Sequence, residues 1–211
     1  MATIDEANAR KAQTVRPGAK KEDRILADVL ARSFWDDPVM SWMLPEQHSR
    51  YHRMRHFFRA ELSSTRSRGE VLTTDDFSGA ALWLPPKQWR LPVSGMVKEA
   101  PHLLLSLRAR IVPSLKLNDL MEKAHPTEPH WYLAVIGTDP VRQGVGAGKA
   151  LITDVLDRCD HDGLPAYLES SKEKNISYYE RFKFEVTGEI KVPDGPVLYS
   201  MWREPQVPDA G

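Results

Sequence analysis

Hydrophobic residues in the first third of the chain recur at the spacing of amphipathic helices. From Glu22 to Phe34 they lie three or four positions apart, which predicts a helix with one buried stripe. The segment 35–38, with two aspartates and a proline, should end this helix, and a second one is expected after Pro45. The predicted inward positions are Ile25, Leu26, Val29, Leu30 and Phe34 in the first helix, and Tyr51, Met54, Phe57, Phe58 and Leu62 in the second.

Short apolar runs then predict strands. Residues 70–74 and 79–84 flank a polar turn, which is the pattern of a hairpin. A short edge strand is expected at 14–17, where a proline is tolerated. Residues 87–129 should form helical stretches that are cut by Pro92, Pro101, Pro113, Pro126 and Pro129.

The last third of the chain alternates strands and helices. Residues 130–137 form an unbroken apolar run, which predicts a strand buried on both faces. A glycine-rich turn follows, and then a helix from about Gly146 to Asp162. A short helix is expected at 175–182, and further strands at 166–169, 184–192 and 197–202. The chain should therefore be α/β or α+β, with helices around a mixed sheet.

Length, composition and charge limit the classes of protein to which this chain can belong. The 211 residues are 41% hydrophobic and 27% charged, as in a soluble globular domain. We expect one domain over 14–204 with a helical insertion at 87–129, between disordered tails at 1–13 and 205–211. Lysine plus arginine equals aspartate plus glutamate at 29 each, and this zero net charge argues against a nucleic-acid partner.

Signals for export or membrane insertion are not expected. The first residues lack the pattern of a signal peptide, and no apolar run approaches the ~20 residues that span a bilayer. The single cysteine, Cys159, lies on the apolar side of a predicted helix and should be an inert buried thiol. We therefore expect a cytoplasmic protein without a membrane partner.

The glycine-rich turn at 143–148 is the segment with candidate chemistry. A turn between a strand and a helix offers unpaired amides and a partial positive charge to an anion. A Walker A loop is excluded because position 143 is Gln and position 150 is Ala. A dinucleotide-binding fingerprint fails too, because its third glycine falls on Lys149 or Leu151.

The same turn also matches Gln-x-x-Gly-x-Gly, and in this it resembles the acyl-CoA diphosphate loop of the GNAT superfamily of acetyltransferases. Residues 166–171 and 175–184 look like the fifth strand and following helix of that family. From about 128 to 203 the chain is similar to puromycin N-acetyltransferase-like proteins. The resemblance implies a GNAT fold, with a mixed and mostly antiparallel sheet flanked by helices, and acetyl transfer from acetyl-CoA.

The resemblance also implies residue roles. Tyr179 would protonate the departing thiolate, and Glu169 could act through water as general base. Backbone groups at 136–138 would bind pantetheine and polarise the thioester carbonyl, and amides at 143–148 would hold the diphosphate. The implied cofactor-binding residues are Ile136, Gly137, Thr138, Gln143, Gly144, Val145, Gly146, Ala147, Gly148 and Asn175.

Several of these residues have a structural alternative. Tyr179 could be a packing aromatic, Asn175 a helix cap and Glu169 an exposed carboxylate, while His130 is expected to be structural. No metal is expected. Three histidines lie four residues apart on the second predicted helix, but no carboxylate or cysteine with metal-ligand spacing accompanies His48, His52 and His56.

Three functions stay open. The favoured one is acetylation of a primary amine of a small molecule by a monomer or homodimer. The others are acetylation of a protein lysine or N-terminus, and acyl-CoA binding without turnover. Lys183 departs from the family, in which glycine is usual at that position. If the turn needs a positive φ, lysine costs ~1 kcal/mol more than glycine, and we expect the turn to be slightly rebuilt.

Overall fold

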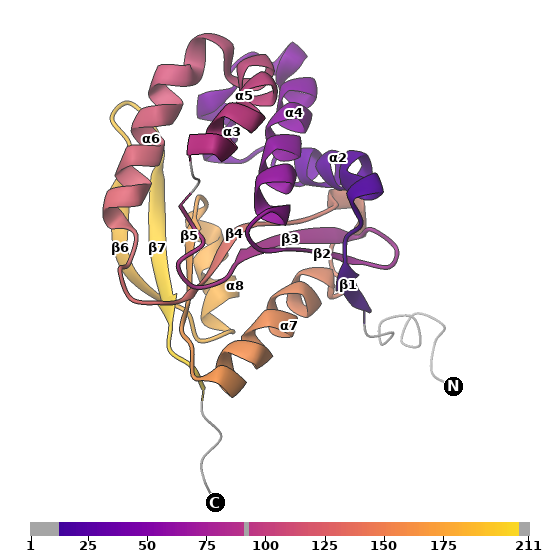
Figure 1. Ribbon diagram of the computed structural model, residues 1–211, viewed down its shortest axis with the longest axis vertical. Coiled ribbons are helices and arrows are strands. Elements are labelled where there is room, and N and C mark those ends of the chain that lie inside the picture. The colour runs from indigo at the N-terminus through magenta and orange to yellow at the C-terminus, as the bar shows by residue number, and fades with distance from the viewer. Residues whose placement is uncertain (1–12, 91–92, 207–211) are drawn as a thin grey trace, which may run out of the picture.

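A seven-stranded sheet forms the centre of the protein, with helices on both faces (Figure 1). The computed structural model describes residues 13–90 and 93–206. The strand order is β1-β2-β3-β4-β5-β7-β6, and only β4 and β5 pair in parallel. The predicted mixed, mostly antiparallel sheet is therefore confirmed. Its strands are β1 (Val15–Pro17), β2 (Glu70–Thr74), β3 (Gly79–Leu84), β4 (Trp131–Thr138), β5 (Ala166–Ser170), β6 (Glu185–Lys191) and β7 (Val197–Arg203).

The helices divide between the two faces of the sheet (Figure 1). One face carries α2 (Asp23–Ser33), α3 (Pro38–Met43), α4 (Gln47–Arg66), α5 (Val93–Leu107) and α6 (Ile111–Ala124). The long helix α7 (Ala147–Asp162) lies on the opposite face, and α8 (Ile176–Glu180) follows β5. Short 3-10 turns are η1 (Lys20–Glu22), η2 (Arg108–Arg110), η3 (Pro140–Arg142) and η4 (Glu173–Asn175).

Each face of the sheet has its own apolar core. Under α2 and α4 the predicted inward residues Leu26, Leu30, Met54, Phe58 and Leu62 are fully buried. Ile25 is a wrong prediction, because it lies beside this stripe and is 46% exposed. Under α7 a second core contains Leu151, Ile152 and Val155 packed near Trp83. Cys159 belongs to this core, and burial raises the pKa of its thiol to about 12, as expected for an inert residue.

Two prolines do not end helices where the sequence predicts that they should. Pro101 lies inside α5, whose packing along α4 outweighs the loss of one main-chain hydrogen bond. Pro113 is the third residue of α6, where a main-chain N–H would have no partner in the helix anyway. Pro92 lies outside the described residues, as do nearly all of the two predicted tails. The predicted domain limits stay a prediction.

The sequence also fails to predict α3, which has six residues. Its start is well defined locally, because Pro38 occupies the first turn and the Asp37 carboxylate accepts a hydrogen bond from the Met40 amide at 3.0 Å. The segment that was expected only to break a helix therefore begins a new one.

Candidate active site

The middle of the sheet opens where β4 and β5 separate. Parallel pairing joins only residues 131–133 of β4 to 166–168 of β5. Beyond these three pairs both strands continue, β4 to Thr138 and β5 to Ser170, without pairing to each other. Main-chain groups of β4 that would have faced β5 can therefore bind another molecule.

A β-bulge lies at the start of this opening. Val135 pairs with Leu82 of β3 and Leu133 pairs with Trp83, so Ala134 has no residue opposite to it. Residues 134–136 are only half-buried. The prediction that this strand is buried on both faces is therefore wrong in its second half, because cavities replace the neighbouring strand there.

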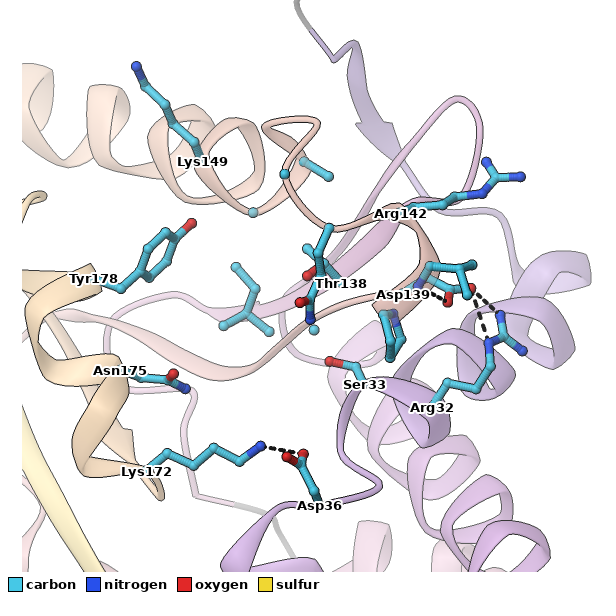
Figure 2. A pocket seen from close by; sticks show the side chains of 18 of the residues that line it. Arg32, Ser33, Asp36, Thr138, Asp139, Arg142, Lys149, Lys172, Asn175 and Tyr178 are labelled. Atoms are coloured by element: carbon cyan, nitrogen blue, oxygen red, sulfur yellow. Dashed lines mark hydrogen bonds and ion pairs between the residues drawn. The ribbon is translucent and has the colours of Figure 1, made fainter. Parts of the chain in front are cut away.

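A large cavity of about 1100 Å³ lies at the end of β4. Figure 2 shows its walls, which come from the end of β4, the start of α7, the segment leading into α8, and α2. This volume slightly exceeds the usual range for small-molecule and cofactor sites, roughly 300–1,000 Å³. The cavity can therefore hold a ligand of cofactor size.

The glycine-rich turn forms one edge of this cavity. Gly144 and Gly146 have φ values of 85° and 87°, a conformation that glycine adopts without strain. A Cβ atom at either position would meet nothing within 4 Å, so both face open space. Gly146 is the N-cap of α7, and no side chain of the described residues caps this helix start. The turn and the first turn of α7 therefore present unpaired amides to an anion.

Gly148 has a different role from the other two glycines. A Cβ atom here would lie 2.8 Å from the Tyr178 hydroxyl oxygen. Glycine at this position lets α8 approach the start of α7, and Tyr178 lines the cavity (Figure 2).

Asp139 holds the start of the turn in place. Its carboxylate accepts hydrogen bonds from Arg32 Nε at 3.0 Å, Arg32 Nη2 at 2.6 Å and the Val141 amide at 3.3 Å. The hydrogen bond from Arg32 lowers the pKa of Asp139, so this carboxylate stays charged. This ion pair thus joins helix α2 to the turn, although the two residues are 107 positions apart in the sequence.

Basic residues outnumber acidic residues around the large cavity. Its two aspartates are paired, Asp139 with Arg32 and Asp36 with Lys172 at 2.5 Å (Figure 2). This excess of positive charge suits a polyanionic ligand. The basic residues on the wall are Arg32, Arg142, Lys149, Lys172, Lys174 and Arg181.

Asn175 directs its side chain into the large cavity (Figure 2). It is the N-cap residue of α8, but its side chain makes no cap hydrogen bond. The alternative that this side chain serves as a helix cap therefore does not describe the structure. Its amide is available to a ligand.

Tyr179 lies where the large cavity meets a smaller one of about 100 Å³, and it lines both. The residue is 8% exposed, and burial raises the pKa of its hydroxyl, with Tyr178 and Asp37 adding to the effect. The phenol therefore keeps its proton at neutral pH and can donate it.

Two buried carboxyl groups line the smaller cavity. The Glu169 side chain is 3% exposed, so the alternative of an exposed surface carboxylate is wrong. Asp37 is 2% exposed and accepts hydrogen bonds from the Ser171 hydroxyl and the Met40 amide. Burial raises the pKa of Asp37.

The structure brings together most residues that the sequence singles out. Glu169 lines the smaller cavity, and Val145 is 48% exposed and is not part of either wall. Arg32, Ser33 and Asp37 also line the cavities, although none of them was among the predicted site residues. The other predicted residues line the large cavity: Ile136, Gly137, Thr138, Gln143, Gly144, Gly146, Ala147, Gly148, Asn175 and Tyr179.

Comparison with known sequences identifies the family. The family described as "Acetyltransferase (GNAT) family" matches residues 75–184, which is more than half of the chain. The chain belongs to the GNAT family of acetyltransferases. Members of this family use acetyl-CoA as cosubstrate, and the chain is accordingly a GNAT N-acetyltransferase.

Relatives and solved structures agree with this assignment. "Uncharacterized N-acetyltransferase C550.08" of Schizosaccharomyces pombe is 29% identical over 208 residues, covering 88% of this chain and 81% of the relative. A structure from Corynebacterium glutamicum described as "histone acetyltransferase HPA2 and related acetyltransferase" has a TM-score of 0.70 at 24% identity, covering 94% of this chain and 99% of that one. Arylalkylamine N-acetyltransferase 2 from Aedes aegypti has a TM-score of 0.55 at 12% identity, covering 92% and 99%.

In the part of the chain that the structure describes, no group of three His, Cys, Asp or Glu residues could hold a metal ion. Of the three histidines on α4, His48 and His52 are exposed, while His56 Nδ1 lies 3.4 Å from His102 Nδ1. None of the described helices has the length and apolar character needed to cross a bilayer.

The position where this GNAT chain has lysine instead of glycine does adopt a positive φ. Lys183 has a φ of 66°, so the lysine takes up the left-handed conformation rather than shifting the turn to a negative φ. We expect Lys183→Gly to stabilise the protein by ~1 kcal/mol, which is about 2–4 °C in Tm for a chain of this size. Thermal unfolding followed by circular dichroism measures this.

A matched control is Lys191→Gly, because Lys191 is an exposed lysine in regular strand β6. Glycine in a strand costs ~0.5–1 kcal/mol, so this variant should melt lower than the wild type. A Tm of Lys183→Gly equal to or below that of the wild type would contradict the assignment of strain to this residue.

Proposed function

We propose that this chain transfers the acetyl group of acetyl-CoA to a primary amine of a small molecule, by direct attack within a ternary complex. The observation that carries the proposal is the meeting of the two cavities. Five residues line both of them, at the opening between β4 and β5: Ser33, Ile136, Lys172, Asn175 and Tyr179. A cosubstrate in the large cavity and an amine in the smaller one would meet at these residues.

The large cavity fits acetyl-CoA in charge and shape. Amides of residues 143–148 and of the first turn of α7 would bind the diphosphate. The basic residues on the wall would compensate the remaining phosphate charge. Main-chain groups at 136–138, which β5 leaves unpaired, would bind pantetheine and polarise the thioester carbonyl. The Asn175 amide would add a contact to the cosubstrate.

The chain itself supplies two proton-transfer groups. Glu169, through a water molecule, would accept the proton that the amine loses as its nitrogen bonds to the acetyl carbon. Tyr179, held protonated by burial, would donate its proton to the departing sulfur. The two side chains line the same small cavity, so both can act on one tetrahedral intermediate.

The size of the smaller cavity supports a small acceptor. At about 100 Å³ it holds little more than an amino group and the atoms next to it.

A first test is binding of the cosubstrate. Acetyl-CoA at a hundred times its dissociation constant should stabilise the fold by ~2.7 kcal/mol. Gly146→Ala should abolish most of this thermal shift, because its added Cβ forces the amides of the turn out of place at φ 87°. Gly163→Ala is the matched control, since Gly163 is the left-handed glycine at the other end of α7. It should lose similar stability, ~1–2 kcal/mol, and keep the full shift.

The second test is turnover. Purified protein is given acetyl-CoA with a panel of small primary amines, and separately with peptides that carry a free lysine or N-terminus. We expect free thiol to be released with one or more small amines only. Turnover with peptides alone would overturn the proposed substrate class. A thermal shift without turnover in either panel would favour the non-catalytic binding module.

A further inference from the structure

Two buried histidines lie behind Glu169, on the side facing α5 and α6. His125 follows α6 and His130 precedes β4, and they are 7% and 3% exposed. The His125 ring is stacked on Trp89 with centroids 3.8 Å apart, and the edges of Tyr132 and Tyr167 pack against it. This packing fixes the ring of His125 in one position.

The hydrogen bonds of the pair determine which nitrogen carries each proton. His130 Nδ1 lies 2.6 Å from the Glu128 carbonyl oxygen, which can only accept, so Nδ1–H is the donor. Burial lowers the pKa of His130, which keeps this ring neutral and leaves its Nε2 as an acceptor. His125 Nε2 lies 3.0 Å from that nitrogen and must therefore donate its proton to it. When the His125 ring is neutral, its Nδ1 therefore carries no proton.

This bare nitrogen faces Glu169. His125 Nδ1 is 3.7 Å from Glu169 Oε1, and both side chains are almost completely buried. Oε1 is a buried oxygen with no hydrogen-bond partner among the described residues. His125 Nδ1 and Glu169 Oε1 are thus two hydrogen-bond acceptors that face each other. A proton on either atom would let them form a hydrogen bond.

We propose that His125 stores the proton that Glu169 removes from the acceptor amine. This inference rests on the proposed function. The N–H bond of the attacking amine breaks, and an O–H bond forms at Glu169 Oε1. That O–H bond then breaks as an N–H bond forms at His125 Nδ1, which leaves an imidazolium beside a regenerated carboxylate. After product release the proton returns through Glu169 to water in the smaller cavity.

The other ionisable groups around this pair are poor alternatives for the proton. On β4 and β5, burial raises the pKa of Tyr132 and of Tyr167, with the charge of Glu169 and a hydrogen bond to it adding to the effect. Both phenols are therefore already protonated and donate to the Glu169 carboxylate, which leaves only its Oε1 without a partner. Glu61 on α4 and Arg68 interact electrostatically with Tyr132 from further away. Burial raises the pKa of Glu61 to about 7, and the charge of Glu99 on α5 adds to this effect.

His125 acts through Glu169 and is thus a positioning residue, so its test is the pH profile of kcat/KM for the amine that is turned over. His125→Gln keeps a hydrogen-bond donor toward His130 but cannot take up a proton. We expect its maximal kcat/KM to fall about tenfold, because Glu169 can no longer pass its proton on to residue 125. The acid-side inflection should also move down by at least about one pH unit, since histidines ordinarily titrate ~2 units above glutamates.

His130→Gln is the matched control. It removes the second ring and its hydrogen bond but leaves His125 and Glu169 facing each other. Its acid-side inflection should stay within a few tenths of the wild-type value, even if its Tm falls. A His125→Gln profile that is lowered at every pH without a change of shape would mean that the ring only packs, and would overturn the proposal.

A second measurement does not depend on turnover. Nitrogen-15 NMR of histidine-labelled protein should show His130 with its proton on Nδ1 and His125 with its proton on Nε2 at about pH 8, and His125 should gain a second proton as the pH is lowered. A resting His125 with its proton on Nδ1, or one that never gains a second proton, would overturn the proposal. If His125 titrates as expected but no amine is acetylated, the proposed function fails while the proton site stands.

Discussion

Replacing Tyr179 with phenylalanine should lower kcat by about 10²- to 10⁴-fold, the usual effect of losing a general acid. The phenol lies where the two cavities meet, and burial keeps it protonated. Without its hydroxyl the sulfur would leave as an unprotonated thiolate. Phenylalanine fills the same space, so the thermal shift caused by acetyl-CoA should be retained. Stopped-flow measurement of thiol release, together with thermal unfolding, separates the two effects.

Tyr199→Phe is the control for this change. Tyr199 is a half-buried tyrosine on β7 that lines neither cavity, and its variant should turn over within about twofold of the wild type. A Tyr179→Phe enzyme with undiminished kcat would mean that Tyr179 is a packing aromatic, and the general acid would have to be sought elsewhere.

Replacing Glu169 with glutamine should lower kcat/KM by about 10²-fold or more at neutral pH. The amide has the shape of the carboxyl group but cannot accept the proton of the amine. The deficit should shrink as the pH rises toward ~10, where more of the amine arrives without its additional proton. The Tm should not fall, because the glutamine N–H can donate to His125 Nδ1. In the wild type the Glu169 Oε1 at this place has no hydrogen-bond partner.

Glu173→Gln makes the same chemical change at an exposed glutamate four residues further on, and it should leave the pH profile unchanged. If Glu169→Gln keeps the wild-type rate at neutral pH, Glu169 is not the base. In that case Asp37, the other buried carboxyl group in the smaller cavity, would be the next candidate.

The sequence predicted correctly those helices and strands whose bounds depend on neighbouring residues in the chain. The hairpin of β2 and β3 has the predicted bounds, because apolar runs and a polar turn specify it without distant contacts. The start of α7 at Gly146 and its end at Gly163 follow from two left-handed glycines. The glycine-rich turn at 143–148 could be found from its own local pattern, whereas the site role of 136–138 came from the resemblance to the family.

Residues that depend on distant partners could not be predicted in this way. Arg32 and Asp139 are 107 positions apart, and nothing near either residue signals their pairing. Glu169 has the sequence surroundings of any strand end, and only the fold places His125 against it. Helix α5 continues through Pro101 because of its packing on α4, which a propensity argument cannot weigh.

The unpaired Ala134 also reverses the alternation of side chains along β4. Before it, Trp131 and Leu133 pack into the core under α7. By simple alternation Val135 would join them, yet it packs into the core under α2, and Ile136 returns to the α7 side. One extra residue therefore decides which way the last part of the strand points. If Ala134 were paired as a regular strand residue instead, Ile136 and Thr138 would exchange faces with Val135 and Gly137, and the wall of the large cavity would be built from the wrong set of residues.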